Sequence, residues 1–161
     1  MDLRRLTRRT ALWCAAAAPL LYAVVSLTAL QVAARQTGGP LTEGMVERAD
    51  TQLASAGGWT GGFALVLAAE AAVLVASGGR LNRRSTAGGL VLCAAVGMVY
   101  LTSLALVVSA THVIVLYPSG DIDLGLLFPG WYFPALIVIA VMTAAALVVW
   151  LAAAVRDASA A

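Results

Sequence analysis

Long apolar runs make up most of the chain, and shorter, more polar stretches separate them. Four segments, residues 11–34, 59–78, 86–110 and 132–155, each hold at least 20 mostly apolar positions. A helix rises about 1.5 Å per residue, so roughly 20 residues cross the hydrocarbon core of a bilayer. The pattern therefore predicts an all-α integral membrane protein whose four transmembrane helices form an up-down bundle.

The connections between these segments differ in length. Residues 35–58 and 111–131 form two long outer loops, whereas residues 79–85 form a short inner loop. In the first outer loop, apolar residues recur every four positions while charged residues fall on other faces; the apolar residues are Leu41, Met45, Ala49 and Leu53. This spacing predicts a short amphipathic outer helix that lies on the membrane or caps the bundle.

The composition agrees with this pattern. Hydrophobic residues make up 61% of the chain and charged residues 11%, and the mean hydropathy is +0.92. A soluble globule of this size would need more polar surface. The length of 161 residues fits one bundle and leaves no room for a separate soluble domain. We therefore expect residues 1–161 to form a single transmembrane domain.

The distribution of arginine predicts the orientation in the membrane. All ten basic residues are Arg, and all but Arg35 and Arg48 flank the predicted inner ends of the spans. Because cytoplasmic segments carry the excess of basic residues, we expect both termini to be cytoplasmic. An Arg-only, Ala-rich composition is typical of GC-rich bacterial genomes, so the expected location is the bacterial cytoplasmic membrane. Anionic lipid accounts for the inner arginines, and no nucleic-acid partner is expected.

The first span also has features of a secretory signal peptide. Arginines precede it, and Val32-Ala33-Ala34 is an acceptable cleavage site. Its apolar core of about 20 residues, however, exceeds the roughly 7 to 15 of a signal peptide. We expect this segment to be retained as a helix, with cleavage as the alternative.

Glu70 is the one acidic residue inside the four apolar segments. A carboxyl group at that depth is costly in hydrocarbon, so we expect it to face protein or water, to be protonated, or both. Counted from the inner ends of the spans, Tyr22 and Thr143 lie at a similar depth, whereas Tyr100 and Ser103 lie further out. Tyr22 and Thr143 are therefore the expected hydroxyl partners of a neutral Glu70.

Two roles for Glu70 remain open. As a structural group it would form a hydrogen bond between helices, worth roughly 0.6 to 2 kcal/mol in a membrane. As a functional group it would be a proton- or ion-coupling site, with Tyr22, Thr143 and Tyr100 as accompanying hydroxyls. The functional role is slightly favoured, because an Asn or Gln could form the same bond without ionising.

Small residues and one proline predict how the helices pack. Gly89, Cys93 and Gly97 repeat every four residues in the third span, in a row that continues to Ser109. Such a face lets another helix approach closely, either within the molecule or in a second copy. In the first span, Pro19 predicts a kink, because proline removes the hydrogen bond to the carbonyl four residues earlier.

The second outer loop holds weaker candidates. Asp121 and Asp123 offer carboxylate oxygens, and His112 lies near the outer end of the third span. Their spacing matches no calcium-binding loop, and a lone histidine is weak support for a metal. We expect solvated turn residues and an interfacial histidine there, and no metal site.

The sequence carries no catalytic motif that we can assign. It contains no G-x-S-x-G, no H-E-x-x-H and no phosphate-binding glycine loop with a lysine. We therefore expect neither enzyme activity nor a cofactor. The sequence favours a non-catalytic accessory or interaction subunit of a bacterial membrane complex, embedded in the lipid bilayer and bound to further copies of itself or to another membrane protein. The alternative is a small oligomeric proton- or cation-coupled transporter that uses Glu70.

Overall fold

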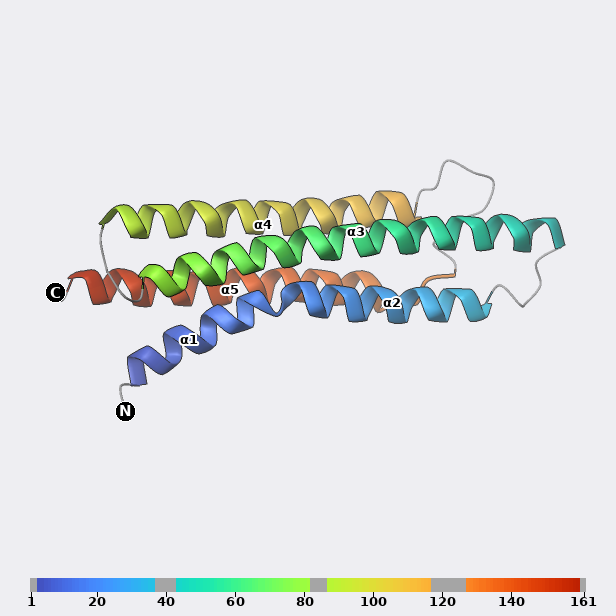
Figure 1. The fold of residues 1–161 in the computed structure, drawn as a ribbon. Coiled ribbons are helices and arrows are strands. Elements are labelled where there is room, and N and C mark those ends of the chain that lie inside the picture. The colour runs from blue at the N-terminus through green and yellow to red at the C-terminus, as the bar shows by residue number, and fades with distance from the viewer. Residues whose placement is uncertain (1–2, 37–42, 82–86, 117–126, 160–161) are drawn as a thin grey trace.

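The computed structural model describes residues 3–36, 43–81, 87–116 and 127–159. Almost all of these residues are helical, and none of them forms a strand, so the predicted all-α fold is confirmed. The five helices, shown in Figure 1, are α1 (Leu3–Ala16), α2 (Ala18–Gln36), α3 (Glu43–Leu81), α4 (Ala87–Leu116) and α5 (Tyr132–Ser159).

Four stretches of helix are long and apolar enough to cross a membrane. They are Leu6–Gln36, Ala49–Arg80, Gly88–Val113 and Tyr132–Arg156, the first of which combines α1 and α2. Each overlaps one of the four predicted spans, although the helices extend further at most of the ends. The fold is therefore that of a multi-pass membrane protein.

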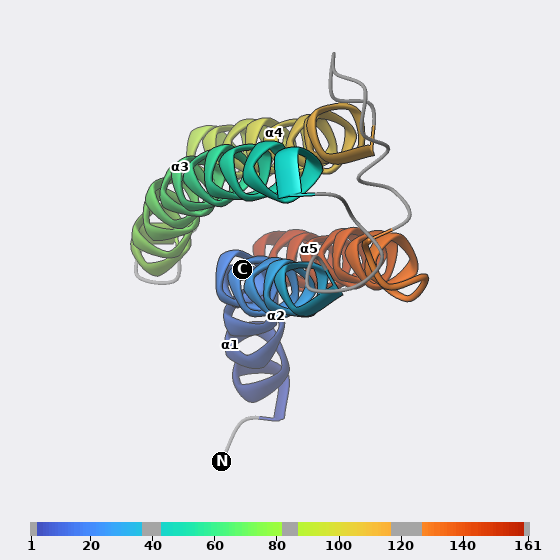
Figure 2. The ribbon, with the colours of Figure 1, turned by 90° about the vertical axis from the view of Figure 1, so that its right-hand side faces the viewer.

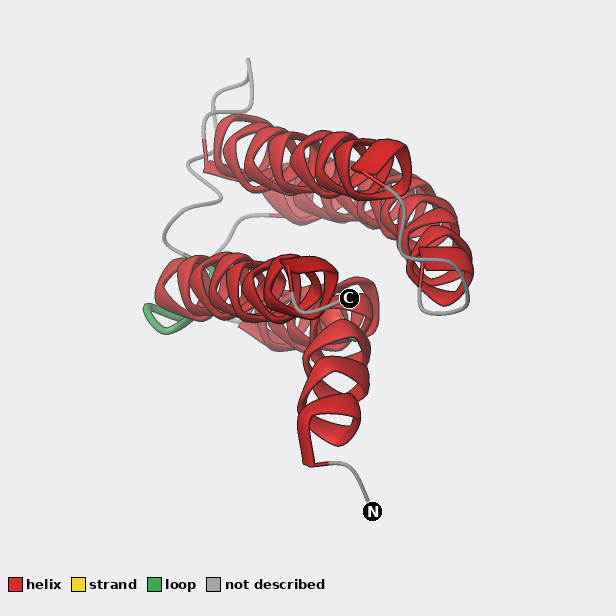
Figure 3. Cartoon of the chain, turned by 90° about the vertical axis from the view of Figure 1, so that its left-hand side faces the viewer, coloured by secondary structure: helices red, strands yellow, loops and turns green. Residues whose placement is uncertain are grey.

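The helices form two layers. Figures 2 and 3 show α3 and α4 side by side in one layer and α2 and α5 in the other, with α1 leading into α2. Contacts also join the layers, between α2 and α3 and between α4 and α5. Successive long helices run in opposite directions, so the two ends of the chain lie at the same end of the bundle (Figure 1).

A repeating seam of buried residues holds the bundle together. On α4 the buried residues follow one another at alternating steps of four and three, namely Cys93, Gly97, Tyr100, Leu104, Val107 and Thr111. On α5 the corresponding residues are Tyr132, Leu136, Ile139, Thr143, Leu147, Trp150 and Ala154. Steps averaging about 3.5 residues keep one side of each helix facing its neighbours along its whole length, as in coiled coils.

The predicted small-residue row coincides with this seam only in part. Cys93 and Gly97 are buried and Gly89 is half-buried, but further along the row Ala105 and Ser109 are exposed. A strict step of four residues turns by about 40° more than a full helical turn each time, so the row rotates away from the interface. A Cβ atom added to Gly97 would have no neighbour within 4 Å, so close approach does not require this glycine.

A tight glycine contact lies instead at Gly78, near the end of α3. A Cβ atom there would stand 2.9 Å from Cδ2 of Leu12 and 3.0 Å from Cζ2 of Trp150. Leu12 and Trp150 are themselves buried. Gly78 thus allows α3 to meet α1 and α5 at the end of the bundle where both chain ends lie.

The predicted separate outer helix is instead the first part of α3. This helix runs without interruption over 39 residues from Glu43 to Leu81. Ala49 and Leu53 are buried as the amphipathic pattern indicated, but the pattern continues directly into the second span. A glycine inside a helix reduces stability by about 1 kcal/mol. Ending the helix there would leave several backbone groups unpaired near hydrocarbon, which would cost more. The paired glycines before and after Trp59 therefore do not end the helix.

We predict that Gly78→Ala and Gly97→Ala have different effects on the free energy of unfolding. Gly97→Ala should be neutral or stabilising by up to about 1 kcal/mol, because alanine favours the helix and its Cβ meets no atom. The free energy of unfolding of Gly78→Ala should be about 1 to 3 kcal/mol lower than that of Gly97→Ala, because Leu12 and Trp150 must shift. Reversible unfolding of both variants in detergent measures the difference, and equal stabilities would contradict the tight contact at Gly78.

Candidate functional site

Glu70 lies on α3 and is held by a residue of α4. The Ser103 hydroxyl donates a hydrogen bond of 2.8 Å to Oε1 of Glu70. Along α3, one turn to either side of Glu70, Leu67 and Leu74 are fully buried. The carboxyl group is therefore fixed in the contact between two neighbouring helices and is only partly accessible.

The second carboxyl oxygen of Glu70 has a different environment. Oε2 is shielded from the surroundings and has no hydrogen-bond partner. A buried polar atom that forms no hydrogen bond costs free energy, and a buried unpaired charge costs more. This oxygen is therefore where a proton or a donor group would bind with the greatest gain.

The two hydroxyls expected to bind Glu70 bond elsewhere. The hydroxyl groups of Tyr22 and Thr111 are 2.9 Å apart, and either can be the donor. Thr143 donates to the carbonyl of Ile139 in its own helix, at 2.7 Å. The structure thus pairs Glu70 with Ser103, which depth counting had placed too far out.

The difference arises from the relative positions of α3 and α4 along the bundle. Glu70 lies 11 residues before the end of α3, whereas Ser103 lies 16 residues after the start of α4. Five residues correspond to about 7 Å of helical rise. Counting from the predicted span ends assumed that all helices begin at one level, and this assumption failed.

Tyr100 has a structural role next to this site. Its hydroxyl donates a 3.0 Å hydrogen bond to the backbone carbonyl of Ala15, and both residues are fully buried. Ala15 is the residue four positions before Pro19, so its carbonyl is the one that the proline leaves without a helical donor. The predicted irregularity is confirmed by the break between α1 and α2 at Ala17. Tyr100 on α4 supplies the missing donor.

Two further hydroxyl contacts cross the bundle nearer its other end. Tyr22 and Thr111 join α2 to α4, and the Tyr132 hydroxyl donates to Oγ of Ser26, joining α5 to α2 at 3.1 Å. All four residues are buried. Sequence reasoning missed these pairs, although tyrosine, serine and threonine at seam positions are the residue types that form such contacts in membranes.

Arg8 was also missed. It lies in α1 within the first span and is only 6% exposed, whereas all ten arginines were expected outside the spans. Its guanidinium Nη2 atom is shielded as well, and the span that contains it begins at Leu6, earlier than predicted.

Of the weaker outer candidates, the structure describes His112. His112 is exposed near the end of α4, and its ring meets Phe133 edge-on at 4.6 Å between centroids. Asp121 and Asp123 lie outside the described residues. Within the described ranges, no group of three His, Cys, Asp or Glu residues could hold a metal ion. Cys14 is exposed and Cys93 buried, and both are free thiols.

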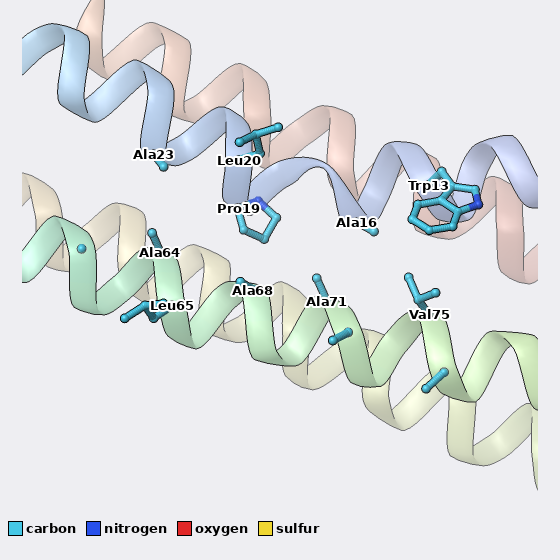
Figure 4. Close-up of a pocket in the computed structure, with 13 residues that line it drawn as sticks. Trp13, Ala16, Pro19, Leu20, Ala23, Ala64, Leu65, Ala68, Ala71 and Val75 are labelled. Atoms are coloured by element: carbon cyan, nitrogen blue, oxygen red, sulfur yellow. The ribbon is translucent and has the colours of Figure 1, made fainter.

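Two apolar grooves lie along the broken first span. The groove between α1–α2 and α3, here called the α3 groove, has a volume of about 870 Å³ (Figure 4). Eight of its 13 lining residues are Ala or Gly. A second groove of about 700 Å³ separates α1–α2 from α5. Glu70 lines neither of them.

No protein-family model, curated protein or solved structure matches this chain. The fold and the contacts therefore define a class only: a multi-pass membrane protein of four spans with one partly shielded carboxyl group between two of them.

We predict that the effect of Tyr100→Phe depends on Pro19. In the natural chain the substitution should cost about 1 to 2 kcal/mol, because the Ala15 carbonyl loses its donor while buried. In a Pro19→Ala background the backbone N–H of residue 19 can take over, so the same substitution should cost markedly less. A double-mutant cycle of unfolding free energies in detergent measures this coupling. Additive effects would show that the two groups do not share the carbonyl.

Proposed function

We propose that this protein is a non-catalytic accessory or interaction subunit of a bacterial membrane complex. The observation that carries the proposal is the outer arm, residues 43–56 of α3. The beginning of this arm projects beyond the other helices at its end of the bundle (Figure 1). Its exposed side carries Glu47, Asp50 and Ser55, while Ala49 and Leu53 are buried. An exposed polar helix face at the end of the bundle is suited to binding another protein.

The use of the buried polar groups supports the same role. Tyr22, Thr111, Ser26 and Tyr132 are bonded in pairs, and Tyr100 bonds a backbone carbonyl. Groups that bond one another across helices fix the arrangement of the bundle and are not available to a substrate. The Ser103–Glu70 contact belongs to the same set, since it links α3 to α4.

We place both termini in the cytoplasm and the outer arm on the opposite side. Exposed Arg9, Arg80 and Arg156 lie at the end of the bundle shared by the two chain ends. Glu47 and Asp50 are exposed toward the other end. A bias of basic residues toward one side is what orients membrane proteins, with the basic side in the cytoplasm.

Reporter fusions test this orientation. A reporter active only in the cytoplasm should work when fused after Ala161, and one active only outside should work when inserted in residues 37–42, because the first span lies between the cytoplasmic N-terminus and that loop. Opposite results at the two positions would refute the orientation.

The function is tested in two ways, by searching for the partner in cells and by measuring proton movement in vesicles. We expect a photo-crosslinking residue at Asp50, on the outer arm, to capture another membrane protein in cells, whereas the same residue at Arg156, at the opposite end, should not. Glu70→Gln should leave this capture unchanged, because the amide oxygen can still accept the Ser103 hydrogen bond. Absence of any cross-linked protein at Asp50 would contradict the proposal.

The alternative is a small oligomeric proton- or cation-coupled transporter, and the unpartnered Oε2 of Glu70 favours it. Vesicles containing the purified protein and a trapped pH-sensitive dye distinguish the two. Under the accessory role, the natural protein and Glu70→Gln give the same proton leak. A proton flux that Glu70→Gln abolishes, while Ser103→Ala retains it, would establish transport and refute the accessory role.

A further inference from the structure

We propose that the α3 groove binds one acyl chain of an anionic phospholipid, whose headgroup is held by Arg9 and Arg80. This inference goes beyond the proposed function and does not depend on it. It rests on the shape of the groove, on its lining, and on the positive charge at one of its ends.

The groove results from the break in the first span. At Ala17 the helix is interrupted, and Pro19 and Ala16 face the α3 residues Ala64, Ala68 and Ala71 across the gap (Figure 4). These side chains are too short to fill the space between the two backbones. The rim, in contrast, carries exposed large side chains, with Leu20 68% and Leu65 74% exposed, so the groove is bordered by the surface that faces lipid in a membrane.

The dimensions of the groove suit an acyl chain. From Gly61 to Ala76 its α3 wall spans about 22 Å at 1.5 Å per residue. One leaflet contributes about half of the roughly 30 Å hydrocarbon core, so an acyl chain of ordinary length fits within the groove. Its volume of about 870 Å³ lies in the range of pockets that hold small ligands.

The two walls of the groove continue into arginines at the same end of the bundle. On α3, Arg80 follows Ala76 by four residues, so it lies about one turn beyond the groove wall and is rotated from Ala76 by about 40°. On α1, Arg9 precedes the groove residue Trp13 by four residues. Both arginines are exposed. The contact of Gly78 with Leu12 lies within one turn of each arginine, so it brings this part of α1 close to the end of α3.

The charge at this end selects an anionic headgroup. Of the side chains that the structure describes there, Arg9, Arg80 and Arg156 are exposed, and none is a carboxylate. Guanidinium groups bind phosphate through paired hydrogen bonds, and each basic residue near a membrane surface strengthens attraction to anionic lipid. An apolar groove that ends at two arginines therefore has the charge and polarity pattern of a phospholipid with a negative headgroup.

The test titrates phosphatidylglycerol or phosphatidylcholine into the delipidated, full-length protein in detergent. Native mass spectrometry counts bound lipid, and thermal unfolding gives the accompanying rise in Tm. We expect phosphatidylglycerol to bind roughly tenfold more tightly than phosphatidylcholine, because the choline cation of phosphatidylcholine offsets the phosphate charge that attracts the two arginines. Equal binding of the two lipids would overturn the proposal.

Matched variants locate the site. Ala68→Phe fills the groove and should weaken binding of both lipids, whereas Ala69→Phe, on the neighbouring exposed position outside the groove, should not. Combined Arg9→Gln and Arg80→Gln should reduce phosphatidylglycerol binding to the level of phosphatidylcholine, whereas Arg156→Gln should leave the preference intact. Equal effects of Ala68→Phe and Ala69→Phe would show that lipid binds the general apolar surface and not the groove.

Two further outcomes would also overturn the proposal. If glycerol 3-phosphate alone raises Tm as much as phosphatidylglycerol, the arginines bind a phosphate without an acyl chain. If the lipid-free protein is a dimer that Ala68→Phe dissociates and Ala69→Phe does not, a second copy fills the groove.

Discussion

Several buried hydroxyl groups in this bundle bond to partners on other helices, and the arrangement of the spans depends on these contacts. Hydrocarbon offers no hydrogen bonds, so each backbone carbonyl or hydroxyl in a span must be satisfied by the protein itself. The clearest case is the carbonyl of Ala15, which Pro19 leaves without a helical donor and Tyr100 satisfies from another helix. A break in the first span thereby fixes the position of α4 across the bundle. The pairs Tyr22–Thr111 and Tyr132–Ser26 act in the same way further along the bundle.

The same break explains why a membrane protein of this size has grooves along its first span. Where α1 and α2 diverge, the facing residues of α3 are mostly alanine, and the gap remains unfilled. At one end α3 returns to close contact with α1, where Gly78 meets Leu12. Side-chain size alone therefore explains both the tight contact at Gly78 and the open face lined by alanine. The bundle thereby has a distinct lipid-binding groove on its surface, whereas its interior is closely packed.

The two carboxyl oxygens of Glu70 differ in their hydrogen bonding. One of its oxygens takes part in the hydrogen bonding between helices, through Ser103, and the other is shielded without a partner. The first oxygen fits the structural role that the buried hydroxyls share. The second gives the carboxyl a capacity to bind a proton that a purely structural amide would lack. Whether Glu70 carries protons therefore distinguishes the transporter from the accessory subunit.

The sequence by itself determined the class of fold, the four spans and the irregularity at Pro19, because these depend on hydrophobic length and on the covalent geometry of proline. It also identified Glu70 as the unusual residue, since an acid within an apolar span is costly unless it is paired, protonated or in contact with water. Only the tertiary structure decided that Ser103 is its partner, that Gly78 and not Gly97 is the close contact, and that the outer helix is continuous with the second span. These outcomes depend on the axial offset and rotation of one helix against another. Both are set by the sum of many side-chain contacts along the seam, which no single stretch of sequence contains.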